Sequence, residues 1–559
     1  MKKLKKNKEN KIDYIDILLF VAPFITGLLS IWSLAFFSIL CICGILYKVV
    51  KKKKIIFPTG KNLIFVIIYL LSFLIVEFYA VDKGMNVLAF FKNLSILLFI
   101  LLYMQFENSS KSMKDRFKVI PYSACTTVIY CLVLMLIPES NIFIENRLQG
   151  TFYYANSYGL FLLIGTFVLF CNEKYSWKDY AMLLILFIGI ILTNSRAIII
   201  LTVVTLIITL FFNKQSFKSK IIIVVCFVLL FGGIYAFSKI EKRINADMVT
   251  SSEFITRLLY YKDALKMIKE NPFGYGYEGW YYKQSEIQTG VYDTKYVHNS
   301  ILQVLLDVGI IPTISLIILL VSTFFSKKQN CFSRIIMLLI IGHSIIDVDL
   351  EYIYFILVLV PFIELKYVEI KLDKSYYLVL TLLSALCIWY FMLFISDVYF
   401  SSKDYESAIK IIPFHTEAIQ EMLYNTSEQK IQLKYASEVL KYNKNVSGAY
   451  EAIRNDLVAK EKYMEAIGVE EKRLSLNKYT MYNYLEYADL LSKALSYYGK
   501  KEDISNQKVI LEKIKAIELM IKDVLENTNP LCYKTIHTPN LEIPIELQEF
   551  INKAKEAQS

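Results

Sequence analysis

The stretch YAMLLILFIGIILTNSRAIIILTVVTLIITLFF, residues 180–212, decides the fold class of this chain. It is largely apolar except for the Thr-Asn-Ser-Arg break at residues 193–196. A helix of roughly 20 apolar residues crosses a bilayer, so the stretch predicts two short spans, about 180–193 and 197–212. An Arg at the centre of a membrane helix costs roughly 2.5–3.5 kcal/mol. Arg196 therefore indicates that the break serves more than chain reversal.

Apolar runs of similar length recur along the chain to about residue 396 and then stop. Each run is long enough to cross the hydrocarbon core, or nearly so when charged ends snorkel. We therefore predict an all-α, polytopic membrane helical bundle of about 12–13 spans. The expected spans are about 14–30, 32–48, 62–80, 85–105, 118–137, 156–171, 180–193, 197–212, 221–237, 299–325, 335–346, 351–366 and 375–396.

The composition agrees with a membrane protein. Apolar residues make up 55% of the chain, charged residues 20% and aromatic residues 15%. Globular chains are usually about 45–50% apolar and about 25% charged, so a disordered chain and a water-soluble enzyme are both excluded. The nine Cys give no disulfide framework, because eight lie in or beside apolar runs and Cys532 has no obvious partner.

Lys and Arg in short loops predict the orientation, because cytoplasmic loops carry an excess of them. With thirteen spans, every basic stretch falls on the side of the N-terminus, which we expect to be cytoplasmic. The net charge of +11 therefore sets topology and gives no reason to expect a nucleic acid partner. The basic stretches are residues 2–11, 48–54, 111–118, 174–178, 214–220, 327–334 and 366–374.

Because thirteen is an odd number of spans, a cytoplasmic N-terminus puts residues 397–559 on the other side of the membrane, outside the cytoplasm. This tail reads as almost wholly helical, with Ala, Leu, Glu and Lys at helical spacing. The tail shows a weak repeat of about 34 residues, in which Leu440, Asn443 and Tyr450 recur as Leu474, Asn477 and Tyr484. That period predicts an extracytoplasmic, tetratricopeptide-like helical domain. An irregular helical bundle is the alternative.

The largest outward loop, about residues 238–298, lies between the ninth and tenth spans. Residues 250–253, Thr-Ser-Ser-Glu, have the spacing of a capping box and predict a helix start. An apolar stripe then predicts a helix that lies on the membrane surface, with Arg257 beside the stripe. The stripe consists of Phe254, Leu258, Tyr261, Leu265 and Ile268, and Asn271-Pro272 ends the helix.

His298 stands directly before the tenth span, in Tyr-Val-His-Asn-Ser-Ile-Leu-Gln, with Asn299 or Ser300 as a cap for the helix. A neutral imidazole can accept a proton at ambient pH, so His298 is a candidate catalytic base. The alternative is a hydrogen-bonded anchor at the interface.

Three arginines are expected on the outward side, Arg147 in Asn-Arg-Leu-Gln-Gly-Thr-Phe, Arg196 and Arg257. Guanidinium groups match phosphate oxygens bidentately, so three of them facing one compartment suit a pyrophosphate at the membrane surface. The alternative is separate snorkelling of each Arg to the interface.

Several acidic groups accompany these residues. Asp307 falls on the helix face opposite His298, which favours a structural hydrogen bond. His343, Asp347 and Asp349 cluster at the outer end of the eleventh span, where Asp347 could orient His298, receive charge from an arginine or merely end the helix. The chain has no Walker loop, dinucleotide fingerprint, zinc-ligand spacing or nucleophile elbow. The absence of these motifs from the sequence argues against ATP-driven transport and serine hydrolysis.

Taken together, these motifs resemble the O-antigen ligase and O-antigen polymerase family of bacterial membrane glycosyltransferases. The resemblance covers about residues 140–350. It differs where many relatives have Glu in place of Asp307 and where isoleucines follow Ala197. The elements that carry it are Arg147-Leu-Gln-Gly-Thr-Phe, Thr-Asn-Ser-Arg196, Arg257 with Asn-Pro-Phe-Gly-Tyr-Gly, and His298-Asn-Ser-Ile-Leu-Gln with Gly309.

The resemblance implies transfer of a glycan from a polyprenyl-pyrophosphate carrier to an acceptor hydroxyl, with no nucleotide, metal or other cofactor. His298, oriented by Asp347, would act as the base, and Arg147, Arg196 and Arg257 would hold the pyrophosphate. The acceptor would be a glycan, lipid, protein or cell-wall polymer at the outer face of the cell membrane. The C-terminal helical domain would offer a surface for a protein partner.

Two other function classes remain open. A flippase for lipid-linked oligosaccharides or an anion transporter would place ionisable groups near the middle of several spans and show an inverted repeat. In this chain the polar groups gather at one surface, and the two halves show no repeat. A non-catalytic membrane anchor that recruits envelope proteins through its helical tail is the third possibility.

Overall fold

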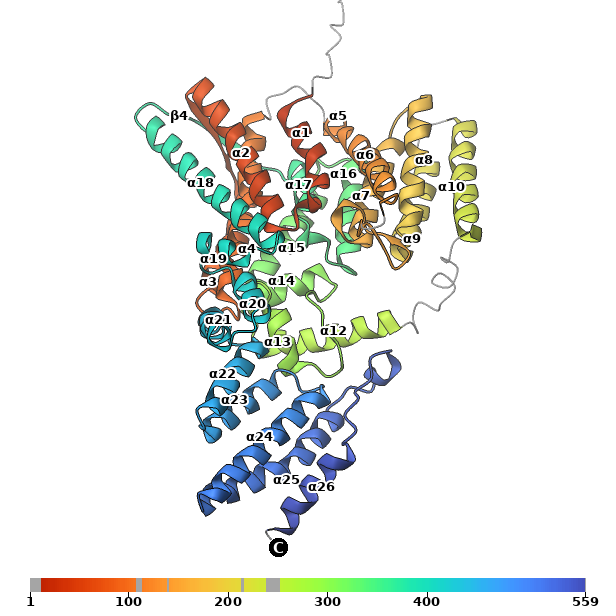
Figure 1. Ribbon diagram of the computed structural model, residues 1–559. Helices are drawn as coiled ribbons and strands as arrows, with labels where there is room; N and C mark the ends of the chain where they lie inside the picture. The colour runs from red at the N-terminus through yellow and green to blue at the C-terminus, as the bar shows by residue number, and fades with distance from the viewer. Residues whose placement is uncertain (1–11, 107–112, 138–139, 213–215, 238–251, 558–559) are drawn as a thin grey trace, which may run out of the picture.

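The structure is a computed structural model that describes residues 12–106, 113–137, 140–212, 216–237 and 252–557. It is an all-α bundle that continues into a C-terminal stack of helices (Figure 1). The helices of the bundle are α1 (Tyr14–Val21), α2 (Ile31–Lys52), α3 (Lys61–Val76), α4 (Lys83–Phe106), α5 (Met113–Phe117), α6 (Val119–Leu134), α7 (Ala155–Phe170), α8 (Trp177–Leu192), α9 (Arg196–Phe212), α10 (Phe217–Phe237), α15 (Ile310–Phe324), α16 (Cys331–Ser344), α17 (Ile353–Leu359) and α18 (Tyr376–Ser401).

Within the described residues, four helices are each long and apolar enough to cross a membrane. They are Ile31–Lys52, Met113–Leu134 (α5 with α6), Lys83–Phe106 and Tyr376–Ser401. Several shorter apolar helices lie beside them, among them α7, α9 and α15. The expected all-α membrane bundle is confirmed at this level.

Three expected spans are wrong as single helices. The first, about 14–30, is α1 followed by the 3₁₀ turns η1 (Ala22–Phe24) and η2 (Thr26–Leu28), because Pro23 ends α1 and Gly27 has a φ of +59°. The tenth, about 299–325, divides at Gly309 into α14 (Ser300–Val308) and α15. The twelfth, about 351–366, is α17 followed by the 3₁₀ turn η5 (Val360–Phe362). The break expected at residues 193–196 separates α8 from α9.

Short strands, which the sequence pattern did not predict, close one end of the bundle. β1 (Lys54–Thr59) pairs antiparallel with β4 (Lys366–Lys371), with Lys54 opposite Lys371. Two of the basic stretches therefore meet at this end (Figure 1). A second pair, β2 (Phe143–Ile144) with β3 (Arg147–Leu148), lies in the loop before α7 and is followed by η3 (Gly150–Phe152).

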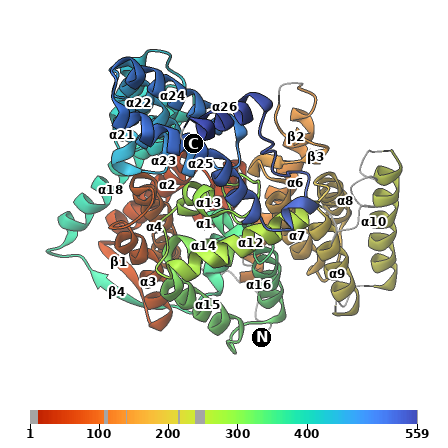
Figure 2. The ribbon, with the colours of Figure 1, turned by 90° about the horizontal axis from the view of Figure 1, so that it is seen from below.

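The opposite end carries α12 (Ser252–Glu270), α13 (Gly279–Ile287) and α14. Figure 2 looks onto this end and shows these helices over its centre, with the C-terminal helices to one side and α8–α10 on the other. The helix start at Ser252 and its end before Asn271 agree with the sequence. Residues 250 and 251 of the expected capping box lie outside the described residues.

The expected apolar stripe of α12 is exposed at Phe254 and Leu265, as a face turned towards the membrane would be. Leu265 is 55% exposed, whereas Leu259 and Met267 are fully buried. They pack in a cluster with Trp280 of α13 and Cys532 of the C-terminal region. The face of α12 beside the stripe is therefore covered by protein, and residues far along the chain supply part of that cover. The position of the stripe on the membrane surface stays a prediction.

The C-terminal helical domain follows α18, which runs without a break past residue 396 to Ser401. Leu440 and Leu474 lie near the ends of α21 and α23, and Tyr450 and Tyr484 lie in the helices that follow. Each Tyr hydroxyl donates to a carbonyl six residues earlier, at 2.8 and 2.9 Å respectively. The two units thus repeat one local contact, and a tetratricopeptide-like relationship stays a prediction. The helices are α19 (Tyr405–Ile411), α20 (Thr416–Tyr424), α21 (Gln429–Tyr442), α22 (Ser447–Ala459), α23 (Tyr463–Ser475), α24 (Met481–Lys500), α25 (Ile504–Glu526), the 3₁₀ turn η6 (Cys532–Lys534) and α26 (Ile545–Glu556).

Candidate functional site

His298 is fixed at the start of α14. Asn299 caps this helix, because its Oδ1 accepts from the backbone N–H groups of Ile301 and Leu302, both at 3.0 Å. His298 itself has a φ of +53°, a left-handed conformation that is uncommon for a residue with a side chain. The Tyr261 hydroxyl of α12 donates to the His298 carbonyl at 2.8 Å. The backbone around His298 is therefore held from two directions.

Asp347 is brought to His298 by the same helix start. Asp347 lies in the loop after α16. Its backbone carbonyl accepts from the Ser300 N–H at 3.0 Å and from the Ser300 hydroxyl at 2.9 Å. Asp347 is 1% exposed. The tenth and eleventh expected spans are thus joined at the ends that the sequence predicts to face outward.

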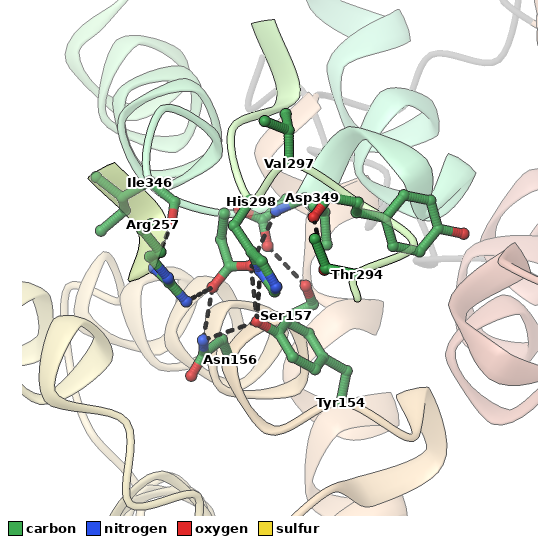
Figure 3. Close-up of polar contacts among 12 residues, drawn as sticks. Tyr154, Asn156, Ser157, Arg257, Thr294, Val297, His298, Ile346 and Asp349 are labelled. Atoms are coloured by element: carbon green, nitrogen blue, oxygen red, sulfur yellow. Dashed lines mark hydrogen bonds and ion pairs between the residues drawn. The ribbon is translucent and has the colours of Figure 1, made fainter. Parts of the chain in front are cut away.

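The side chains of His298 and Asp347 form a pair, and Figure 3 shows His298 beside Tyr154, Asn156 and Arg257. His298 Nδ1 lies 3.3 Å from Asp347 Oδ1. The carboxylate also accepts from the Tyr154 hydroxyl at 2.8 Å and from the Asn156 amide, both at the start of α7. Although burial opposes ionisation, the hydrogen bond from His298 and the charge of Arg257 hold the pKa of Asp347 below its usual value.

An ionised Asp347 fixes the imidazole tautomer. The Asp347 carboxylate accepts a hydrogen bond from His298 Nδ1–H, so the free lone pair of the neutral imidazole is on Nε2. The side chain of His298 is 24% exposed. Burial and the neighbouring Asp347 raise the pKa of Tyr154 well above its usual value, so its hydroxyl remains a donor. The pair has the geometry of an oriented base.

Arg257 and Arg147 both reach this cluster. Arg257 Nη2 lies 3.6 Å from Asp347 Oδ2, and its Nη1 donates to the Ile346 carbonyl at 2.7 Å. Arg147 donates from Nη2 to the Asn156 side-chain oxygen and from Nε to the Thr193 carbonyl at 3.1 Å. Two of the three expected arginines therefore bond to residues of the cluster or of the adjoining turn.

Arg196 lies at the first residue of α9, in the turn that begins at Thr193. Asn194 in this turn has a φ of +49°. Because Arg147 binds the Thr193 carbonyl, the segments that carry Arg147 and Arg196 adjoin. Arg196 is half-buried.

A second acid–histidine pair lies next to the first. His343 Nδ1 is 2.6 Å from Asp349 Oδ2, and the Ser157 hydroxyl donates to Asp349 Oδ1 at 2.8 Å. Both His343 and Asp349 side chains are fully buried. This pair packs α16 against α7 and η4 (Asp349–Glu351) without access to solvent. It supports the loop that carries Asp347.

Some site residues escaped the sequence analysis. Tyr154 and Asn156 contribute two of the contacts to Asp347, and the only signal for them was a polar Tyr-Ala-Asn-Ser run at the start of an apolar helix. The Tyr260 ring lies 6.1 Å from the His298 ring and nearly parallel to it. Asp307 accepts from Gln303 Nε2 at 3.0 Å, which agrees with the structural hydrogen bond expected for it.

A cavity of about 260 Å³ lies elsewhere, between α7, α9 and α16. Phe170 and Lys114 are among its lining residues, whereas the site surrounds the opposite end of α7. Among the described residues, no group of three or more His, Cys, Asp or Glu side chains is placed to hold a metal ion.

Residues 181–317 match a family model described as O-antigen ligase. This range runs from α8 to α15 and contains Arg196, Arg257 and His298, whereas Arg147 and Asp347 lie outside it. None of the curated proteins matches the chain. The family match supports membership of the O-antigen ligase and polymerase family. With the apolar helices, it supports a multi-pass membrane glycosyltransferase of that type.

Proposed function

We propose that this chain, which carries an O-antigen ligase domain at residues 181–317, transfers or polymerises a polyprenyl-pyrophosphate-linked glycan onto an acceptor hydroxyl. The reaction takes place at the outer face of the cell membrane. The observation that carries the proposal is the cluster in which His298, Asp347 and Arg257 meet. Residues 1–396 form the membrane domain, with residues 238–298 as its catalytic loop, and residues 397–559 form the extracytoplasmic domain.

The reaction is a single inverting displacement. His298 Nε2 removes the proton of the acceptor hydroxyl as the acceptor oxygen bonds to the anomeric carbon. The bond from that carbon to the diphosphate oxygen breaks, and its electron pair leaves with the diphosphate. Asp347 stabilises the imidazolium that forms, as the 3.3 Å contact supports.

The arginines hold the leaving group. Arg257, Arg147 and Arg196 provide positive charge where the diphosphate develops negative charge. The leaving group is already good, so position and charge compensation suffice and neither a metal nor a cofactor enters the mechanism. The basic end closed by β1 and β4 faces the cytoplasm, and the His298 end faces outward.

The direct test is His298→Ala, measured with purified enzyme and a defined lipid-linked glycan. We expect transfer to be lost while binding of the carrier is retained, because the histidine acts on the acceptor proton. His537→Ala is the matched control, since His537 is exposed in the C-terminal domain. Near-normal turnover by His298→Ala would refute the assignment. Mass spectrometry of surface glycans with and without the gene would separate polymerase from ligase by chain length and attachment point.

A further inference from the structure

Lys295, three residues before His298, lies between two carboxylates. Its Nζ is 2.6 Å from Glu278 Oε1 and 2.8 Å from Glu417 Oε1. Glu278 stands at the start of α13 in the outer loop, whereas Glu417 lies in the first turn of α20 in the C-terminal helical domain. A residue of the C-terminal domain therefore contacts the segment that carries the proposed base.

Glu278, at the start of α13, holds Lys295 in place. The Glu278 side chain is 2% exposed and its backbone has a φ of +60°. Burial raises the pKa of Glu278 above its usual value even though Lys295 opposes the shift. Removing the partner of a buried carboxylate is strongly unfavourable, so the ammonium group is retained here. Glu417 then decides where between the two carboxylates it lies.

The first turns of α20 dock firmly on the membrane domain. Thr416 Oγ1 donates to Asp82 Oδ1 at 2.9 Å, and the Tyr282 hydroxyl of α13 donates to Gln420 Oε1 at 2.9 Å. A Cβ atom on Gly84 would lie 2.1 Å from the Phe414 carbonyl oxygen, so the two backbones touch. Glu417 thus reaches Lys295 from a fixed platform.

The chain between Lys295 and His298 has little freedom to absorb a shift. The Thr294 carbonyl accepts from Trp280 Nε1 at 3.1 Å, and the Thr294 N–H donates to Gln284 Oε1 at 3.2 Å. The Val297 N–H donates to Gln303 Oε1 at 3.1 Å. Val297 is fully buried. Lys295 and His298 thus belong to one short, anchored segment, and we expect a displacement of Lys295 to shift His298.

We infer that the C-terminal helical domain is a working part of the catalytic site, and that Glu417, through Lys295, positions His298 for proton transfer. This inference rests on the proposed function. Lys295 and Glu417 are positioning residues, since neither needs to touch substrate. The domain therefore does more than offer a surface to an acceptor or to a protein partner.

The test uses the full-length enzyme and the variants Glu417→Gln and Lys295→Gln. A misplacement of about 1 Å can cost up to about 100-fold in rate, so we expect kcat to fall about tenfold in each variant while KM for the lipid-linked donor changes less than about twofold. The double variant should be no worse than Lys295→Gln alone, because that single change already breaks the contact with Glu417. Glu421→Gln is the control, since Glu421 lies on the same helix and accepts from Asn425 within the domain.

A second measurement does not depend on turnover. Hydrogen–deuterium exchange of the peptide over residues 291–303 should rise in Glu417→Gln and stay at the wild-type level in Glu421→Gln. If Glu417→Gln melts early, Glu417→Asp keeps the charge with one methylene less, and it should lower kcat without early melting. An unchanged kcat with unchanged exchange would overturn the inference, as would a raised KM at normal kcat. Failure of the wild-type enzyme to transfer glycan would instead refute the proposed function, whatever the exchange shows.

Discussion

At the scale of single residues, Arg257 uses one planar group for two contacts. Its Nη1 donates to the Ile346 carbonyl while Nη2 faces the Asp347 carboxylate. A guanidinium has five N–H donors in a fixed fork, so it can keep these contacts and still present N–H groups to a diphosphate. A lysine ammonium is a compact point charge and cannot reproduce the fork.

Arg257→Lys is therefore expected to lower kcat/KM for the lipid-linked donor by about 10- to 100-fold, although the charge is kept. The same exchange at Arg196 should also cost more than its conserved charge suggests. Steady-state kinetics on purified variants would measure both. Lys262→Arg on the exposed face of α12 is the control. An unchanged KM and rate would exclude a bidentate role.

Asp82 is a buried carboxylate at the contact between the two domains. It accepts from the Met85 N–H, the Thr416 hydroxyl and the Asn443 amide, at 2.8, 2.9 and 3.0 Å. Burial raises the pKa of Asp82 to about 6, although these hydrogen bonds oppose the shift. The folded state therefore keeps the Asp82 proton to a higher pH than the unfolded state does.

It follows that Asp82 lowers the stability of the folded protein as pH rises from about 4 to about 6, by at most ~3 kcal/mol. Thermal melting of the full-length protein in detergent would measure this. We expect the melting temperature of Asp82→Asn, relative to wild type, to rise across that pH window and then to level off. Parallel curves for the two proteins would contradict the assignment.

The sequence predicted the chemistry-bearing residues of the site better than their supports. His298 and Asp347 were predicted because each is an ionisable group at the expected outer end of an apolar run, and Arg257 because it lies beside the apolar stripe in the outward loop. Tyr154 and Asn156 were missed because nothing in a linear pattern connects the start of α7 with a loop some 190 residues later. Such contacts exist only after the helices have packed.

At the scale of elements, the chain at Gly309, between α14 and α15, crosses the turn that contains Gly274. Gly309 has a φ of +83° and Gly274 a φ of +92°. A Cβ on Gly309 would lie 2.5 Å from the Phe273 carbonyl carbon, and one on Gly274 would lie 2.7 Å from the Gly309 nitrogen. Backbone meets backbone here, so neither position has room for a side chain.

Gly309→Ala should therefore lower both the stability of the protein and its transfer activity, because the crossing sets how α14 and His298 meet the outer loop. Gly342→Ala in α16 is the control, since a Cβ there would meet nothing within 4 Å. Melting curves and initial rates on the two variants would check this. Equal behaviour of the pair would mean that the crossing is not rigid.

The elements themselves divide into predictable and unpredictable ones. The apolar runs gave the helices of the bundle because length and hydrophobicity are local properties. The protein-covered side of α12 was not predicted because its cover, which includes Cys532, comes from the far end of the chain. β1 was not expected because its partner β4 lies in another loop and supplies half of the ladder.

At the scale of the whole molecule, basic loops and site lie at opposite ends (Figure 1). A tag at the C-terminus should therefore be accessible to a membrane-impermeant protease in intact spheroplasts, whereas a tag at the N-terminus should be protected until the membrane is opened. Immunoblots of both tagged proteins would check the orientation. Protection of the C-terminal tag would reverse the proposed topology.

The pairing of Lys54 with Lys371 also bears on how the protein is made. A ribosome adds about 5–20 residues per second, so the roughly 300 residues between the two strands take on the order of 15–60 s to emerge. During that interval the backbone N–H and C=O groups of β1 that later pair with β4 bond to water instead. The two strands can pair only after β4 has left the ribosome. The β1–β4 pair at the basic end therefore forms late in synthesis, after most of the membrane helices have left the ribosome.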